Sequence, residues 1–129
     1  MSTSMNQPAS LFDRLGGSAG IRNIVDQVVA LHMQNPVIAS RFLPYQNTET
    51  LELVKGHLRT MLEAASGGTA TYTGRSMPEA HRGMNVNATE YVAALDDILA
   101  ALQTCGVDDE TQKDLLAMVY GLKGEILHR

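Results

Sequence analysis

Histidine can bind a metal ion or move a proton near neutral pH, and this 129-residue chain has four of them. His32, His57 and His81 stand at helical spacing from apolar residues, whereas His128 lies next to the C-terminus, where we expect solvent. A single histidine on an apolar stripe is more often a hydrogen-bonded core residue than a ligand. Three histidines that point inward from separate helices, with no acidic cluster beside them, favour an apolar pocket that offers imidazole nitrogens.

The motifs of several other chemistries are missing from this chain. The single cysteine, Cys105, excludes an internal disulfide, a zinc site built from cysteines and a CxxCH haem attachment. No HExxH zinc motif and no GxSxG nucleophile elbow occurs. An apolar helical pocket with one or two opposed imidazoles is instead what a b-type haem needs, because the porphyrin requires a dry slot and its iron takes a histidine nitrogen.

The stretch SMPEAHRGM, residues 76–84, contains a helix start and then a histidine. Ser76 and Glu79 have the spacing of a capping box, Pro78 fits the first turn, and Gly83 ends the helix almost at once. So short a helix is unstable alone. Either His81 is an ordinary polar residue on a connector, or the segment exists to hold its imidazole in place.

Apolar residues recur at helical spacing from Leu11 onward, and no stretch alternates with a period of two long enough for a strand. The pattern predicts an all-α fold with four main helices and several short ones. We expect a short helix at 11–15 and a connector at 37–47. The four main helices are expected from Ser18 to Pro36, from Thr48 to Gly67, from Asn87 to Gly106, and from Asp108 or Asp109 onward. The acidic pair Asp96 and Asp97 is expected on a solvated helix face.

Composition indicates one soluble globular domain at 10–129 behind a flexible tail at 1–9. The chain is 44% hydrophobic and 19% charged, and its net charge of −4 argues against nucleic acid or an anionic membrane as the main partner. No apolar run approaches the roughly 18 residues of a membrane helix, and the first residues lack the features of a signal peptide. We therefore expect a cytoplasmic protein.

Several segments together resemble one family. They are LFDRLGG at 11–17, Phe42, ASGG at 65–68, YTGRSMPEAHRGM at 72–84 and TCGV at 104–107. In these segments the chain resembles the truncated haemoglobins of the first group, over nearly its whole length. The resemblance implies a truncated globin, a two-over-two helical sandwich with short first and proximal helices.

The resemblance also implies roles for particular residues. His81 would be the proximal iron ligand of a haem b, and Phe42 would stack on the porphyrin. The haem slot would further be lined by Val54, Leu58, Met77, Val86 and Tyr91, with Tyr72 and Arg75 near the propionates. Some members link the haem covalently through a histidine of the last helix; that position here is Gly124, which implies a non-covalent haem.

On the distal side the chain departs from the family pattern. Val29, preceded by Val28, stands where a tyrosine is usual, and Leu58 stands where a glutamine is usual. A buried donor to a bound diatomic ligand is worth roughly 1.5–3 kcal/mol, which is about ten- to a hundredfold in affinity. The expected distal pocket is therefore apolar, which disfavours high-affinity oxygen storage and assisted nitric oxide dioxygenation.

Two histidines add alternatives on that side. His57 falls where many members carry a basic residue that reaches a propionate, and where some carry a histidine that binds the iron. It is thus either a distal ligand in a bis-histidyl, six-coordinate haem or a residue at the solvent edge. His32 is either a distal polar group or, as we favour, a buried residue hydrogen-bonded to the connector.

The sequence thus predicts a haem b protein that binds O2, NO or CO, or that transports oxygen, with ligands displacing His57 if the iron is six-coordinate. The alternatives are a haem-based redox or gas sensor, an electron-transfer module, an enzyme acting on nitric oxide or nitrite, and a helical domain that has lost its haem. A reductase is a candidate partner, and we expect a monomer or weak dimer.

Overall fold

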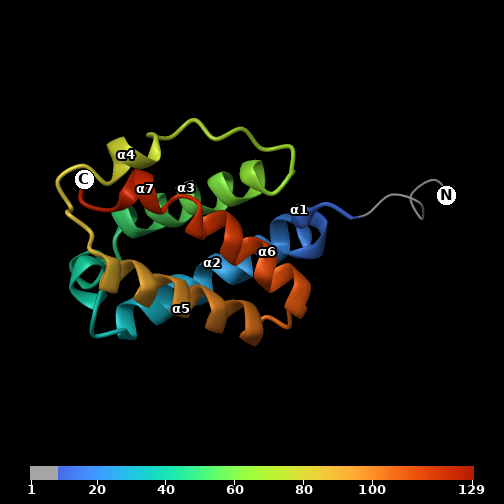
Figure 1. The fold of residues 1–129 in the computed structure, drawn as a ribbon, viewed down its shortest axis with the longest axis horizontal. Helices are drawn as coiled ribbons and strands as arrows, with labels where there is room; N and C mark the ends of the chain where they lie inside the picture. The colour runs from blue at the N-terminus through green and yellow to red at the C-terminus, as the bar shows by residue number, and fades with distance from the viewer. Residues whose placement is uncertain (1–8) are drawn as a thin grey trace, which may run out of the picture.

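The computed structural model describes residues 9–129, so most of the expected tail at 1–9 lies outside it. The described chain is helical (Figure 1). Its elements are α1 (Leu11–Arg14), α2 (Gly17–Gln34), the 3-10 turns η2 (Ala39–Arg41) and η3 (Leu43–Tyr45), α3 (Glu49–Ala65), α4 (Met77–Ala80), α5 (Ala88–Thr104), α6 (Asp109–Tyr120) and α7 (Lys123–Ile126). Between residues 9 and 129 the one β pairing is an isolated bridge from Val86 to Leu127. The all-α prediction is confirmed.

Side-chain caps start most of these helices where the sequence predicts. Ser10, Thr48, Asn87 and Asp108 each accept a hydrogen bond from the backbone N–H three residues on. The exception is α2, which begins after Gly16 instead of being capped by Ser18. Gly16 has a φ of +95°, a left-handed conformation that costs a glycine little.

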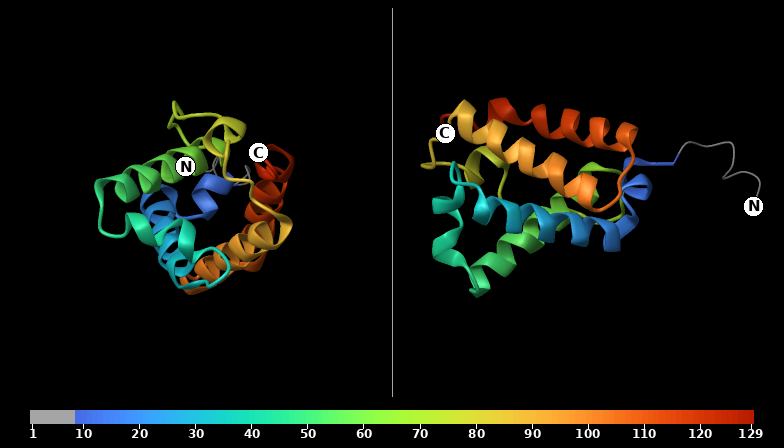
Figure 2. Two further views of the ribbon diagram at one scale, coloured as in Figure 1. Left: turned by 90° about the vertical axis from the view of Figure 1, so that its left-hand side faces the viewer. Right: turned by 90° about the horizontal axis from the view of Figure 1, so that it is seen from below.

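The long helices form two layers, α2 with α3 and α5 with α6, and α2 also packs against α5 (Figure 2). The main buried cluster joins these layers. It contains Leu15, Ile21, Ile24, Val25, Val28, Val29, Leu51, Ala101, Leu102 and Leu115. A second, smaller cluster lies around Val86, Tyr91 and Ile126, where α7 packs against α4.

Three features differ from the sequence prediction. The last helix breaks at Gly121, which with Gly124 weakens the helical preference of this turn, so that α7 follows α6 as a separate element. Asp97 is not solvated; its side chain is only 13% exposed. Val54 is 36% exposed, and Leu51 is the one buried side chain of α3. The apolar face of α3 is thus only partly covered by the protein itself.

Candidate haem site

The short helix α4 holds His81 in a defined orientation. The capping box is present, with the Glu79 N–H donating to Ser76 Oγ at 3.3 Å and the Ser76 N–H donating to Glu79 Oε1 at 3.2 Å. His81 is the C-terminal cap, and its Nδ1 lies 2.8 Å from the carbonyl oxygen of Met77. Because a carbonyl only accepts, Nδ1 carries the proton and Nε2 keeps a free lone pair. This is the arrangement in which protein histidines bind metals.

The segment that follows His81 is attached to the C-terminal end of the chain. Asn85 donates its N–H to the Arg129 carbonyl at 2.9 Å, and His128 donates its N–H to the Val86 carbonyl at 2.9 Å. Val86 is buried, and Met77 and Met84 pack against the same cluster. The proximal segment is therefore fixed to α7 on one side and presents apolar side chains beside His81.

This small domain contains two separate apolar clusters instead of one continuous core. Along α5 the second cluster holds Tyr91 and Leu95, and the main cluster resumes at Ile98. The chief contacts of α3 are with α2 and η3, whereas those of α4 are with α7. Leu58 of α3 and Met77 of α4 are only partly buried. Apolar side chains left half-covered between two cores fit a porphyrin, which buries them on binding.

Three of the distal residues named from the sequence lie together, in the main cluster or against it. Val28 and Val29 are 8% and 1% exposed in the main cluster, and Leu58 packs against it. None of these three side chains can donate a hydrogen bond. This wall of the site is apolar.

His57 lies at the surface of α3. Its side chain is exposed, and its ring meets that of Tyr72 edge-on, with 6.2 Å between centroids. The Tyr72 hydroxyl in turn donates to the Arg75 carbonyl at 2.7 Å. The structure therefore groups His57, Tyr72 and Arg75 at an exposed rim, and the inward orientation expected for His57 from its stripe is wrong.

His32 is buried in a polar cluster. Its Nδ1 lies 2.7 Å from Asp97 Oδ2, and Asn35 Nδ2 donates to both oxygens of the same carboxylate at 3.2 Å. Its ring is also 5.1 Å from the ring of Phe42. The prediction that His32 is hydrogen-bonded to the connector is wrong. Its partner is Asp97, which belongs to α5. Burial lowers the pKa of His32, and Asp97 opposes that shift without reversing it.

A second polar contact holds Arg41, the residue before Phe42. Arg41 Nη2 donates to Glu90 Oε1 at 3.0 Å and to the Met84 carbonyl at 2.9 Å. The Arg41 guanidinium lowers the pKa of the Glu90 carboxyl, whose side chain is 14% exposed. The connector that carries Phe42 is thus fixed to α5 at Glu90, whereas Asp97 of α5 binds His32 and Asn35 at the end of α2. Sequence reasoning missed both pairings, because each joins residues about 50 to 65 positions apart.

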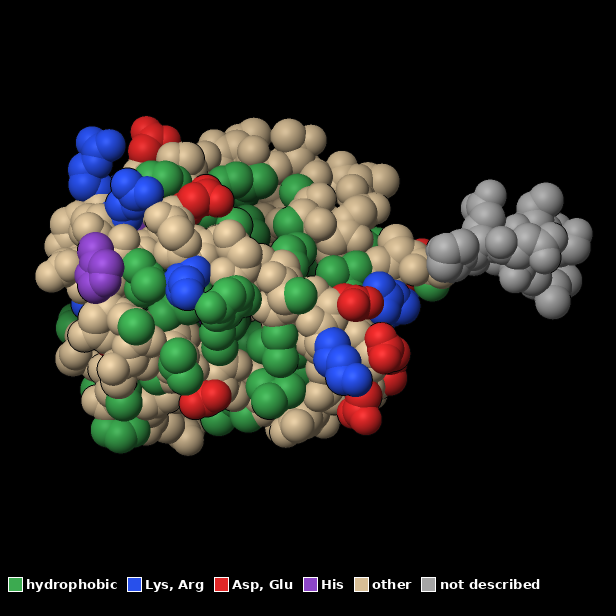
Figure 3. Space-filling model, viewed as in Figure 1, with side chains coloured by type: hydrophobic (Ala, Val, Ile, Leu, Met, Phe, Trp, Pro, Cys, Tyr) green, Lys and Arg blue, Asp and Glu red, His purple; other side chains and the backbone are tan. Residues whose placement is uncertain are grey.

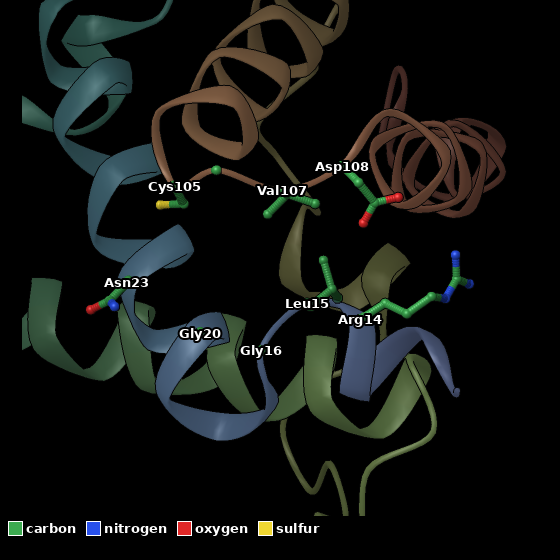
Figure 4. Close-up of a pocket in the computed structure, with 9 residues that line it drawn as sticks. Arg14, Leu15, Gly16, Gly20, Asn23, Cys105, Val107 and Asp108 are labelled. Carbon is green, nitrogen blue, oxygen red and sulfur yellow. The ribbon is translucent and has the colours of Figure 1, made fainter. Parts of the chain in front are cut away.

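Another hollow of the molecule lies among different elements (Figure 4). It is about 330 Å³ in volume and is lined by Arg14, Leu15, Gly16, Gly20, Asn23, Cys105, Gly106, Val107 and Asp108. Its cation, Arg14, is already bound to Asp114 at 2.8 Å. None of the candidate haem residues borders it.

The donor set fits iron held by a macrocycle better than a free metal ion. Among residues 9–129 no three histidine, cysteine or acidic side chains are grouped closely enough to bind a metal. A porphyrin brings four nitrogen ligands of its own, so one histidine is enough. None of the helices within this range has both the length and the apolar character needed to cross a membrane.

Comparison with known proteins decides the family. The sequence model of the bacterial-like globins matches residues 10–128. The chain belongs to this globin family. It is 29% identical over 125 residues to a group 1 truncated haemoglobin of Synechocystis sp., with 94% of each chain covered. It is 26% identical over 120 residues to one of Mycolicibacterium paratuberculosis, covering 93% of this chain and 85% of the relative.

Solved structures agree in fold. The Fe(III) form of the truncated haemoglobin of Tetrahymena pyriformis superposes with a TM-score of 0.85 at 21% identity, covering 94% of this chain and all of that one. The haemoglobin of Chloroflexus aurantiacus superposes with a TM-score of 0.78 at 25% identity over 95% of this chain and all of that one. The predicted family and the two-over-two fold are confirmed, and this globin is a haem-binding protein that takes diatomic gases such as O2.

Proposed function

We propose that this globin holds a non-covalent haem b through His81 and binds O2, NO or CO on the opposite, apolar side. The observation that carries the proposal is the 2.8 Å contact between His81 Nδ1 and the Met77 carbonyl, which leaves Nε2 as the ligating nitrogen. The haem supplies an iron with an open coordination position for a diatomic ligand. The protein residues fix where that iron sits and what surrounds it.

Apolar side chains support haem retention in this account. Met77, Val86 and Tyr91 border the proximal side, and the Tyr91 hydroxyl donates to the Val119 carbonyl, so only its ring faces the slot. Phe42 follows Arg41, which binds Glu90, and it would stack on the porphyrin. Tyr72 and Arg75 lie at the exposed rim, where the propionates reach water. Gly124 offers no side chain for a covalent link.

The apolar distal wall determines which diatomic ligands the site can stabilise. Val28, Val29 and Leu58 cannot stabilise a polar ligand such as O2 by hydrogen bonding, whereas CO needs little such help. We therefore propose modest oxygen affinity with fast release, and this argues for ligand binding or sensing over long-term oxygen storage.

A bis-histidyl haem is the second candidate, and the loose packing of α3 favours it. Leu51 is the only buried side chain of this helix, and Gly56 directly precedes His57. His57 would have to leave Tyr72 and turn inward to reach the iron. In that form the protein would act in electron transfer or redox sensing, with an external ligand displacing His57.

The test of the main proposal is loading purified protein with ferric protoporphyrin IX. We expect about one haem per chain, a Soret band, complete extraction of the haem into acidic butanone, and a CO spectrum in the ferrous form. Absence of a Soret band would overturn the proposal. Haem that stays with the protein on extraction would overturn the claim that the haem is bound non-covalently.

A His57→Ala variant separates the two coordination states. A high-spin ferric spectrum in wild type that the substitution leaves unchanged supports the open site. A low-spin spectrum that becomes high-spin in the variant supports the bis-histidyl form. His128→Asn is the matched control, since His128 is exposed and asparagine tolerates its φ of +59°.

A further inference from the structure

The outer surface of the α5–α6 pair has an apolar groove that the haem site does not use. It has a volume of about 400 Å³. Its lining residues are Leu95, Asp96, Leu99, Leu116, Ala117 and Tyr120. Figure 3 shows apolar side chains gathered in the middle of this face, with charged side chains toward its ends.

This surface is costly for an isolated chain to leave in water. Tyr120 is 53% exposed, and Val92, one turn before Asp96 on α5, is 54% exposed. Leu95, Leu99 and Leu116 are only partly covered. Contiguous exposed apolar surface of this kind marks an interaction site more often than scattered apolar residues do.

Opposite charges flank the groove, with Asp96 on α5 and Lys123 on α7 just beyond the end of α6. Asp96 lines it from α5. Lys123 Nζ lies 2.8 Å from the Tyr120 hydroxyl and 4.5 Å from the centre of that ring, so a cation stands at the α6 side. Among residues 9–129 neither Asp96 nor Lys123 forms an ion pair. Both charges are available to a partner.

A dimer with its two-fold axis parallel to the helices would bury the apolar groove of both copies and would also pair the two opposite charges. Such a rotation lays α5 of one copy over α6 of the other, and it turns the Asp96 edge of each copy toward the Lys123 edge of the other. The small side chain of Ala117 lets the helices approach. An axis across the helices would instead lay α5 over α5 and leave the opposite charges apart.

We propose that a second copy of this chain docks in the α5–α6 groove and forms a two-fold symmetric dimer with a four-helix interface. The geometry resembles that of helical bundles in general, in which antiparallel helices bury facing apolar stripes. Six residues line the groove, which is few beside the roughly 20–30 per side of a stable interface. We therefore expect a weak dimer, with a dissociation constant on the order of 10 μM.

Sedimentation of the haem-loaded protein between 1 μM and 500 μM tests this. Wild type should pass from monomer to dimer across the range. Asp96→Lys and Lys123→Asp should each weaken association at least tenfold, because each variant brings like charges together twice. The double variant Asp96→Lys, Lys123→Asp should recover the dimer, since the charge pair is restored in reverse.

Lys113→Asp is the control, because Lys113 also lies on α6 but outside the groove and is 74% exposed. It should dimerise like wild type. Circular dichroism and haem content establish that each variant is folded. A wild type that stays monomeric throughout, or a double variant that does not recover association, would overturn the proposal. Neither outcome bears on haem binding, which the spectra measure separately.

Discussion

His81 is set apart from the other histidines by what holds its ring. Its Nδ1 faces a carbonyl of its own helix, whereas His57 and His128 are exposed and His32 is buried against Asp97. A backbone carbonyl fixes the tautomer without adding a charge. The imidazole is therefore oriented before any ligand arrives, which lowers the entropy that haem binding must overcome.

The missing distal donor leads to a test at Leu58. Leu58→Gln should slow oxygen release from the ferrous protein about tenfold, because the new amide can donate a hydrogen bond to the ligand. Glutamine is close to leucine in size, so the packing cost should be small. Stopped-flow measurement of oxygen dissociation gives the rate.

Leu53→Gln is the matched control for this change. It lies on the same helix but is 65% exposed, so its amide should remain in solvent and leave the rate unchanged. Equal rates in Leu58→Gln and wild type would show that Leu58 does not face the ligand.

His32 leads to a prediction about pH. Burial lowers its pKa in the fold, so below pH 6.5 the unfolded chain binds a proton that the folded chain resists. Its contribution to stability is complete above pH 6.5 and is lost as pH falls toward the folded pKa. The unfolding free energy should fall by up to about 1.4 kcal/mol per pH unit in that window.

His32→Gln should make that profile flatter, since glutamine does not titrate and still offers a donor to Asp97. Urea unfolding at several pH values from 7.5 to 5 measures it in both proteins. The two proteins differ at no other position, so the difference between their profiles isolates His32. If the unfolding free energy of the two proteins changed with pH in parallel, the pH dependence would not come from His32.

Among the elements, the helix starts were the most predictable from sequence. The capping boxes at Ser76 and Asn87 depend on residues three apart, and the structure forms both. The break at Gly121 was not predicted, because it depends on how α7 packs against α4 and on the pairing of Val86 with Leu127. Local rules specify where helices begin, but tertiary contacts decide where this last one divides.

Helix α3 should be the easiest of the long helices to stabilise. Gly56 lies within it, and a Cβ there would meet only Arg59, at 3.8 Å. Gly56→Ala should raise the unfolding free energy by about 0.5–1 kcal/mol, since it reduces the entropy of the unfolded chain. Chemical denaturation measures the change.

Gly20 of α2 provides the opposite case. A Cβ there would lie 2.1 Å from the Leu15 carbonyl oxygen, so Gly20→Ala should destabilise the fold by more than 1 kcal/mol. If the two substitutions had effects of the same sign, helix propensity alone would explain them, and the close approach of α1 to α2 would not matter.

On the scale of the whole molecule, the haem slot results from packing that the protein leaves incomplete. Two apolar clusters share α5 but remain separate, and Arg41 of the connector and His32 of α2 are both bound to α5. The spacing of apolar residues predicted which helix faces are buried, and the family resemblance predicted which residues line the haem slot. Neither could show that Asp97 is buried or that His57 turns outward, because those depend on neighbours far away in the chain.

The most direct test of the central claim is the haem content of a His81→Ala variant, with His128→Asn as its control. Wild type and His128→Asn should bind one haem per chain with the same Soret band. His81→Ala should lose most of its haem, and added imidazole should restore the band by supplying the missing nitrogen. A His81→Ala protein that keeps full haem content and an unchanged spectrum would contradict the account.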